Sequence, residues 1–207
     1  RPKWLKSTIL NLQSSGINCV GVAPGKPYEH LLPGCNSAVV FGNGGTKLWD
    51  NFMEDLRKNP DHLRLHKHPF DDFIHRCISK ADPNPEPNRR WIRCAAEERV
   101  FIDFRPLAHA AGLGSSSQMG LLIHPEYGLW FGLRAVLLST EAVQINPPQT
   151  IGSPCDDCDD KPCITSCPAG AVRTTGWDVK RCAQFHTESE RCHGRCHSRL
   201  SCPVGFQ

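Results

Sequence analysis

The chain has 207 residues, with 24 Lys or Arg and 21 Asp or Glu, which gives a formal net charge of +3 at pH 7. This length accommodates one full domain and an appendage. No run of basic residues is longer than a pair such as Arg89-Arg90, so the sequence argues against nucleic acid as a partner. It also contains no export leader and no long apolar segment, which predicts a cytoplasmic protein without a membrane partner.

The first part of the chain predicts a domain in which short strands are interleaved with helices. Apolar spacing typical of a helix occurs at residues 5–12, and two further helical faces contain Phe52 and Phe73. Residues 17–22 and 38–41 are expected to form short buried strands.

Three further strands are expected at residues 100–104, 121–123 and 129–138. The last two are joined by a turn at residues 124–128. Alternate prolines in residues 82–88 forbid both a helix and a sheet ladder, so this segment is predicted to be an extended loop.

Proline and glycine residues at 146–148 and 152–154 indicate a hinge. We therefore predict a first domain at residues 1–150 and a cysteine-rich domain at residues 151–207. The first domain is expected to be α/β or α+β.

Eight of the 12 cysteines follow this hinge, in two groups that each end on a Cys-Pro pair. This order is typical of a segment that wraps two 4Fe–4S clusters, in which the fourth cysteine of each group ligates the other cluster. The crossover rule predicts a first cysteine set and a second cysteine set. The first set is Cys155, Cys158, Cys163 and Cys202, and the second set is Cys167, Cys182, Cys192 and Cys196.

Two spacings depart from the common pattern. The step from Cys158 to Cys163 is two residues longer than usual, and the stretch from Cys192 to Cys202 is also long. A zinc site that combines cysteine pairs with His193 or His197 is the main alternative. The residues Pro168 to Val172 are expected to begin a short helix after the Cys-Pro pair.

The sequences AGLG at residues 111–114 and GLLIHPEYGLWFGL at residues 120–133, followed by the cysteine-rich tail, resemble the cobalamin-dependent epoxyqueuosine reductases and the reductive dehalogenases. With LPG at residues 32–34 and PNRR at residues 87–90, they also resemble the cytosolic cobalamin-processing protein that removes the upper ligand. The resemblance implies an α+β, nitroreductase-like corrinoid-binding domain followed by a small ferredoxin-like domain with two 4Fe–4S clusters.

The resemblance also implies base-off cobalamin. The Asp-x-His-x-x-Gly signature that supplies a lower histidine ligand in mutases is absent from this sequence, which agrees with that expectation. Cobalt without a strong lower ligand is easier to reduce, and two nearby clusters could supply its electrons. A reductant such as flavodoxin or ferredoxin is the expected donor, and the nitroreductase-like fold suggests a homodimer.

The same resemblance identifies candidate cofactor residues. Asp103 matches the aspartate that is thought to donate a proton beside the cobalt, although it could equally be the N-cap of a following helix. Aromatic residues could line the corrin, or could instead belong to the core. Serine and arginine side chains could contact its amide and phosphate groups, or could fill turns and be solvated. The cofactor-binding candidates are Gly114, Ser115, Ser116, Ser117, Tyr127, Trp130, Phe131, Arg89 and Arg90.

These observations predict a cobalamin-binding iron–sulfur oxidoreductase that reduces cobalamin or removes its upper ligand. Reduction of an external substrate, such as epoxyqueuosine or an organohalide, is the alternative enzyme function. Because the sequence stops five residues after Cys202, tRNA is not the expected substrate. A cobalamin carrier without turnover and a plain electron-transfer protein remain as non-enzymatic alternatives.

Overall fold

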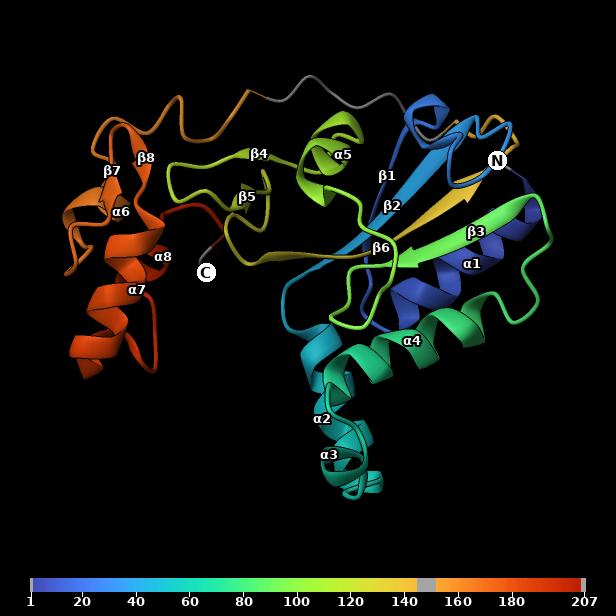
Figure 1. The fold of residues 1–207 in the computed structure, drawn as a ribbon, viewed down its shortest axis with the longest axis horizontal. Helices are drawn as coiled ribbons and strands as arrows, with labels where there is room; N and C mark the ends of the chain where they lie inside the picture. Colours follow the sequence, from blue (N-terminus) through green and yellow to red (C-terminus); the bar gives the residue numbers. More distant parts are fainter. Residues whose placement is uncertain (1, 145–151, 206–207) are drawn as a thin grey trace. The chain divides into compact units, whose positions relative to one another are not determined.

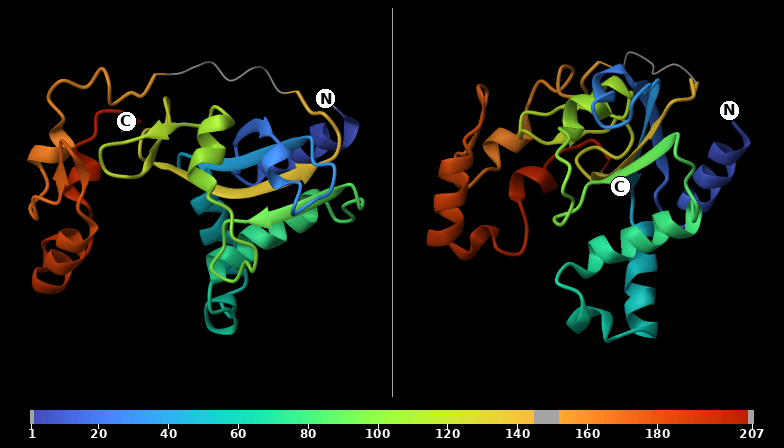
Figure 2. Two further views of the ribbon diagram at one scale, coloured as in Figure 1. Left: turned by 45° about the horizontal axis from the view of Figure 1, so that its top comes forward. Right: turned by 45° about the vertical axis from the view of Figure 1, so that its right-hand side comes forward.

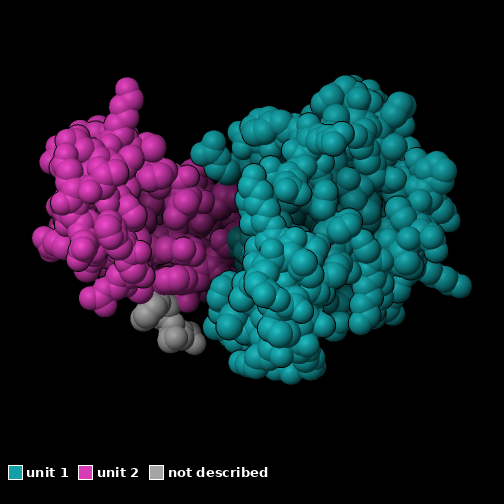
Figure 3. Space-filling model, turned by 60° about the horizontal axis from the view of Figure 1, so that its bottom comes forward, with its two compact units in different colours: residues 1–113, 132–149 teal, residues 114–131, 150–207 magenta. Residues whose placement is uncertain are grey.

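The computed structural model describes residues 2–144 and 152–205. The chain forms two compact units, which Figure 3 distinguishes by colour. The first unit comprises residues 1–113 and 132–149, and the second comprises residues 114–131 and 150–207. The predicted hinge at 146–148 and the predicted boundary at residue 150 lie outside the described residues.

The first unit contains a four-stranded sheet with the order β1-β2-β6-β3. Its strands are β1 (Cys19–Pro24), β2 (Ser37–Gly44), β6 (Phe131–Ser139) and β3 (Arg89–Arg93). β1 pairs antiparallel with β2, and β3 pairs antiparallel with β6. All eight residues of β2 are buried, as expected for a central strand that is covered on both faces.

Three helices supply most of the core on one face of this sheet. They are α1 (Lys3–Ser14), α2 (Lys47–Lys58) and α4 (Pro69–Ala81), and each contains a helix predicted from apolar spacing. Leu12, Phe52 and Ile74 pack in one buried cluster with Val39 and Phe41 of β2. α1 and α4 lie side by side in all views (Figures 1 and 2).

The other face of β1 is covered by α5 (Phe104–Ala110). Gly21 permits this contact, because a Cβ atom built on it would lie 2.1 Å from the carbonyl oxygen of Ala111. Val20 and Val22 pack against the core cluster, and alternation along a strand therefore directs Gly21 to the opposite face. At β1 the sheet of the first unit is thus covered on both faces.

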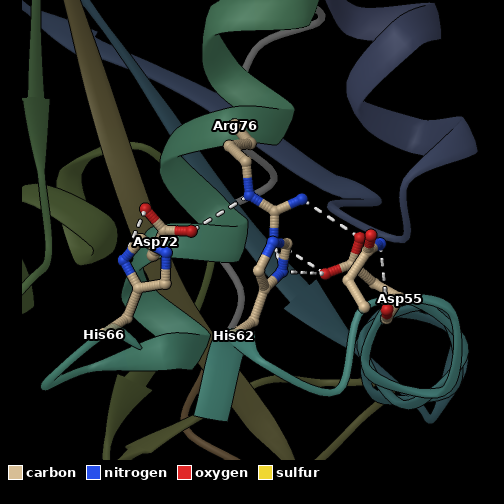
Figure 4. A network of polar contacts seen from close by, with 6 residues as sticks. Asp55, His62, His66, Asp72 and Arg76 are labelled. Atoms are coloured by element: carbon tan, nitrogen blue, oxygen red, sulfur yellow. Dashed lines mark hydrogen bonds and ion pairs between the residues drawn. The ribbon is translucent and has the colours of Figure 1, made fainter. Parts of the chain in front are cut away.

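A polar network joins α2, α4 and the short helix α3 (His62–Leu65), as Figure 4 shows. The guanidinium of Arg76 forms two hydrogen bonds with Asp55, at 3.0 and 2.7 Å, and a third with Asp72 at 3.0 Å. His62 Nδ1 lies 3.2 Å from Asp55, and His66 Nδ1 lies 3.5 Å from Asp72. The Arg76 guanidinium holds the pKa of the Asp55 carboxyl below its usual range.

Two predictions for the first unit require correction. Residues 100–103 form no strand, and α5 begins at Phe104. Ile102 is buried and Phe101 is 90% exposed, so the alternation is present, but the segment has no partner strand. The sequence also missed β3, which directly follows the correctly predicted loop at residues 82–88.

The second unit contains two small ribbons and several short helices. β4 (Ser115–Ser116) pairs with β5 (Leu122–Ile123), and β7 (Val172–Arg173) pairs with β8 (Gly176–Trp177). The helices of the cysteine segment are α6 (Pro162–Thr165), α7 (Val179–Glu188), η2 (Glu190–Cys192) and α8 (His197–Leu200). The predicted helix after Pro168 is wrong, because residues 168–170 form a turn that leads into β7.

Residues 114–131 pack with the cysteine segment. Met119, Ile123 and Leu129 share a buried cluster with Val172. The predicted turn at residues 124–128 is confirmed, and its Gly128 has a φ of +55°. A Cβ atom on Gly128 would lie 1.8 Å from the carbonyl oxygen of Val204, so glycine permits close contact with the segment that follows Cys202.

A short 3-10 helix, η1 (Lys26–Tyr28), lies in the connection between β1 and β2.

The fold is a mixed arrangement of helices and strands. None of the helices formed by residues 2–144 and 152–205 is both long and apolar enough to cross a membrane.

Candidate metal centre

The eight clustered cysteines lie around two separate cavities of the second unit. Each cavity is lined by one of the two sets that the crossover rule predicts. Cys155, Cys158, Cys163 and Cys202 line the first cavity, and Cys167, Cys182, Cys192 and Cys196 line the second. All of these cysteines are free thiols. The chain thus brings together four sulfur donors twice, although their role as ligands remains a prediction.

Short turns present the first cysteine set. Cys163 lies in α6, which begins with Pro162 at its first position. Burial raises the pKa of Cys163, and the neighbouring thiols of Cys155, Cys202 and Cys158 raise it further. The same crowding would favour a cation or a positively charged iron core, which compensates the mutual repulsion of thiolates.

The second cysteine set is held by α7 and the turns around it. Asp178 caps α7 by accepting a hydrogen bond of 3.0 Å from the backbone N–H of Arg181, which fixes the start of the helix that contains Cys182. Burial raises the pKa of Cys192, and so do the nearby thiols of Cys196, Cys167 and Cys182.

Cys167 has a different environment from the other members of the second set. Burial opposes its ionisation, but hydrogen bonds from the backbone N–H groups of Val172 and Ala171 and from the side chain of Ser198 lower its pKa. The N–H of Ala171 lies 3.3 Å from its sulfur. Backbone donors that point at sulfur are typical of iron–sulfur sites, where they stabilise negative charge.

The donor set of each cavity fits a 4Fe–4S cluster, because such a cluster requires four thiolates. The first cavity is narrow, about 30 Å³, whereas the second measures about 290 Å³. Within residues 2–144 and 152–205, no three His, Cys, Asp or Glu side chains converge on a single-ion site. His197 lines the second cavity, while its Nε2 lies 3.0 Å from the carbonyl oxygen of Arg191.

The aromatic candidates surround His124, to which the sequence assigned no role. The ring centroid of His124 lies 5.0 Å from that of Tyr127 and 5.1 Å from that of Phe131. Its Nδ1 accepts hydrogen bonds from the backbone N–H groups of Glu126 and Tyr127, at 3.1 and 3.2 Å. Burial of the ring lowers the pKa of His124, although Glu126 acts in the opposite direction. The signal in the sequence that could have indicated His124 is its position at the start of the predicted turn at residues 124–128.

Trp130 contacts Arg199 of the cysteine segment. The guanidinium carbon of Arg199 lies 4.2 Å from the centre of the Trp130 ring. Arg199 also lines the second cavity. This contact joins the segment at residues 120–131 to the second cysteine set within the second unit.

The glycine and serine candidates form the ribbon at β4 and the turn after it. Ser115 is buried, and its hydroxyl has no hydrogen-bond partner among the described residues. Ser116 and Ser117 line an open polar hollow that also contains Lys161. Gly114 has a φ of +154°, and a Cβ atom there would lie 2.8 Å from the carbonyl oxygen of Ile123.

The remaining candidates belong to the first unit and have structural contacts. Arg89 is buried, lies 3.5 Å from Asp82 and stacks over the ring of Trp4 at 4.4 Å. Arg90 is exposed and donates a hydrogen bond of 2.6 Å to the carbonyl oxygen of Leu31. The cofactor-binding residues predicted from the resemblance are therefore divided between the two units.

Asp103 is the N-cap of α5, as the alternative interpretation of the sequence expected. Its Oδ1 accepts a hydrogen bond of 3.1 Å from the backbone N–H of Arg105. The side chain is 49% exposed, so the burial that a proton donor beside cobalt would require is not observed. Burial raises the pKa of Tyr28, and the charge of Asp103 contributes to this shift, which identifies Tyr28 as a neighbour that the sequence had not indicated.

Comparison with solved structures shows which folds this chain resembles. No protein-family model matches it. Its fold resembles epoxyqueuosine reductase from Streptococcus thermophilus, with a TM-score of 0.59 and 14% identity over 99% of this chain and 66% of that one. It also resembles a B12-trafficking protein of C. elegans, with a TM-score of 0.54 and 14% identity over 100% and 90% of the two chains. A catabolic reductive dehalogenase has a TM-score of 0.58 and 15% identity over 93% and 30%.

The sequence comparison is more specific than the fold. Epoxyqueuosine reductase from Synechococcus sp. strain CC9605 is 32% identical over 170 residues, which cover 78% of this chain and 48% of the relative. The chain is therefore a homologue of the epoxyqueuosine reductases, and the resemblance inferred from the sequence is confirmed. It spans about half the length of the curated relatives that match most of it.

Proposed function

We propose that this chain is a cobalamin-linked iron–sulfur reductase with a nitroreductase-like domain and a ferredoxin-like cluster domain. The observation that carries the proposal is the pair of cavities, each lined by four cysteines in the crossed grouping typical of two 4Fe–4S clusters. When bound, the clusters would supply single electrons and base-off cobalamin would supply a reducible cobalt. Reduction of cobalamin or removal of its upper ligand is the preferred reaction.

The chain's own residues would hold and insulate these groups. The two cysteine sets would ligate the clusters, and backbone N–H groups such as that of Ala171 would stabilise their charge. The ribbon at β4 offers the buried, unpartnered hydroxyl of Ser115 to a polar ligand group. The aromatic rings of Tyr127 and Phe131, which pack on His124, would exclude water from a bound corrin.

Composition and spectra of anaerobically purified protein test this function. Two 4Fe–4S clusters require about eight iron and eight sulfide per chain, whereas the zinc alternative gives zinc without sulfide. We expect added cob(II)alamin to change the visible spectrum and to yield cob(I)alamin on photoreduction. Iron and sulfide without any cobalamin response would leave a plain electron-transfer protein, and binding without reduction would leave a carrier.

Asp103 is proposed as the proton donor, with a change in the position of its loop. Epoxyqueuosine reductase from Bacillus subtilis has been captured with an aspartate catalytic loop swung out of the active site. In this chain Asp103 caps α5 instead. Asp103→Asn separates the two roles, because asparagine is also a good N-cap but donates no carboxylic proton. We expect Asp103→Asn to keep wild-type thermal stability and to lose reductase turnover; full turnover in this variant would remove Asp103 from the mechanism.

Reduction of an external substrate is the second candidate, and the homology to epoxyqueuosine reductases favours it. One solved epoxyqueuosine reductase contains a tRNA-Tyr stem loop modified with epoxyqueuosine. The expectation that nucleic acid is not a partner is in tension with that complex. Incubation of reduced protein with epoxyqueuosine-modified stem loop, followed by mass analysis of the nucleoside, distinguishes the two candidates. Loss of one oxygen atom from the nucleoside would support the external substrate.

A further inference from the structure

Lys161 occupies an unusual position beside the first cavity. It lies in the lengthened step between Cys158 and Cys163 and lines the cavity of the first cysteine set. Its Nζ donates hydrogen bonds to the carbonyl oxygens of Cys155 and Cys158, at 3.0 and 2.9 Å. One side chain thus ties together the two cysteines that begin the set.

The backbone of Lys161 is strained. Its φ of 39° and ψ of 58° make it the one non-glycine residue with a positive φ among residues 2–144 and 152–205. A side chain in this left-handed region costs about 1 kcal/mol or more, and glycine would avoid that cost. The following Pro162 starts α6, and the carbonyl oxygen of Lys161 accepts a hydrogen bond from Ile164. The conformation therefore aims Cys163 at the cavity, while the side chain reaches back to the other two cysteines.

The charge of Lys161 is the second part of the argument. The surrounding loop contains four exposed aspartates, and Lys161 is its single basic residue between Cys155 and Cys167. Exposed carboxylates are screened by water, whereas the half-buried Lys161 Nζ is fixed by two hydrogen bonds at the cavity. The four aspartates are Asp156, Asp157, Asp159 and Asp160.

We propose that Lys161 is a positioning residue of the first cluster, which orders the Cys155–Cys158 turn and favours the reduced state of the cluster. This inference rests on the proposed function, because it requires the first cysteine set to hold a 4Fe–4S cluster. Uptake of one electron takes the cluster with its four thiolates from a charge of about −2 to about −3, with no bond made or broken. A fixed positive charge stabilises the more negative state and raises the reduction potential.

The experiment uses full-length protein with both clusters, and it starts from the wild-type iron and sulfide content. If wild-type protein lacks about eight iron per chain, the proposed function fails before Lys161 is tested. Cys192→Ser protein, in which only the first cysteine set is intact, identifies the electron paramagnetic resonance signal of the first cluster. A redox titration with dithionite, monitored by that signal, then measures its midpoint potential in each variant.

Three substitutions separate the charge from the backbone conformation. Lys161→Met removes the charge and keeps an unbranched side chain, Lys161→Gly also relieves the left-handed strain, and Lys161→Arg keeps the charge. We expect Lys161→Met and Lys161→Gly to shift the reduction equilibrium of the first cluster roughly tenfold toward the oxidised form, a fall of about 59 mV for one electron. Lys161→Arg should keep a midpoint potential close to that of the wild type. The midpoint potential of the second cluster should be the same in all variants.

Lys180→Met is the matched control, because Lys180 is an exposed lysine of α7 in the same unit. Loss of about four iron from Lys161→Met but not from Lys180→Met would also support the inference, since it would show that the first set is no longer ordered. Wild-type iron content and wild-type potentials in Lys161→Met would overturn it. A shift confined to the second cluster would overturn it as well.

Discussion

Arg199 stacks on Trp130, with its guanidinium carbon 4.2 Å from the centre of the indole ring. The Nε and Nη2 atoms of the same guanidinium donate hydrogen bonds to the carbonyl oxygen of Leu129, at 3.1 and 2.7 Å. Arg199 follows Cys196 by three residues and lines the second cavity. One side chain therefore holds the segment at residues 129–130 against the second cysteine set.

Replacement of Arg199 by lysine should weaken this contact, even though the charge is kept. Lysine cannot reproduce the planar stack or the paired hydrogen bonds. We expect Arg199→Lys to lower the free energy of unfolding by about 1–2 kcal/mol. Thermal unfolding under anaerobic conditions, followed by tryptophan fluorescence, measures the change. Arg195→Lys, at an exposed position of the same segment, is the control and should unfold like the wild type.

The two cysteine sets should lose their metal independently. The described cavities share no cysteine, so Cys163→Ser should remove the first cluster and Cys192→Ser the second. We expect each variant to fall from about eight to about four iron per chain. Cys94→Ser, an exposed cysteine of the first unit, should keep the full content. Loss of all iron from either ligand variant would contradict the separation of the two sites.

Several elements could be predicted from the sequence because their signals are local. The apolar faces around Phe52 and Phe73 follow from helical periodicity, and the buried strand β2 was expected from the apolar run at residues 38–41. The grouping of the cysteines followed from their order, because the crossover is a property of the motif. The mixed fold class and the turn at residues 124–128 were found in the same way.

Other features depend on contacts that are distant in sequence, and no local pattern could indicate them. β3 reads as Arg-Arg-Trp-Ile-Arg, and its Arg89 is buried because Trp4 and Asp82 surround it. Gly128 meets Val204 across 76 residues, which places residues 114–131 with the cysteine segment. The lengthened step before Cys163 was visible as a departure, but its Lys161 acquires a role only through the carbonyl groups that it contacts.

Gly128 should be sensitive to the addition of a single methyl group. In Gly128→Ala the new Cβ would lie 1.8 Å from the carbonyl oxygen of Val204, and the φ of +55° disfavours any side chain. We expect the segment after Cys202 to be displaced and the first cluster to be lost, so that iron falls to about four per chain. Gly45→Ala is the control, because Gly45 has a φ of +74° with open space around it. Full iron content in Gly128→Ala would contradict this packing.

The stability of the second unit should depend on pH through His124. Its Nδ1 accepts two backbone hydrogen bonds and its ring is buried, so the folded state disfavours protonation and the pKa lies below the unfolded value of about 6.5. The unfolded chain therefore binds the proton more readily. The contribution of neutral His124 is complete above about pH 6.5 and is lost as the pH falls through the folded pKa, with a slope of at most about 1.4 kcal/mol per pH unit.

Histidine NMR titration measures this pKa, and the resonance that disappears in His124→Asn identifies the residue. Asparagine provides a similar acceptor oxygen without titrating in this range. We expect the melting temperature of wild-type protein to fall between pH 7 and pH 5.5 more steeply than that of His124→Asn. Because the aromatic contacts with Tyr127 and Phe131 are also changed, the comparison rests on the pH dependence rather than on the absolute stability. A His124 resonance that titrates at or above 6.5 would show that the ring is not held as a neutral acceptor.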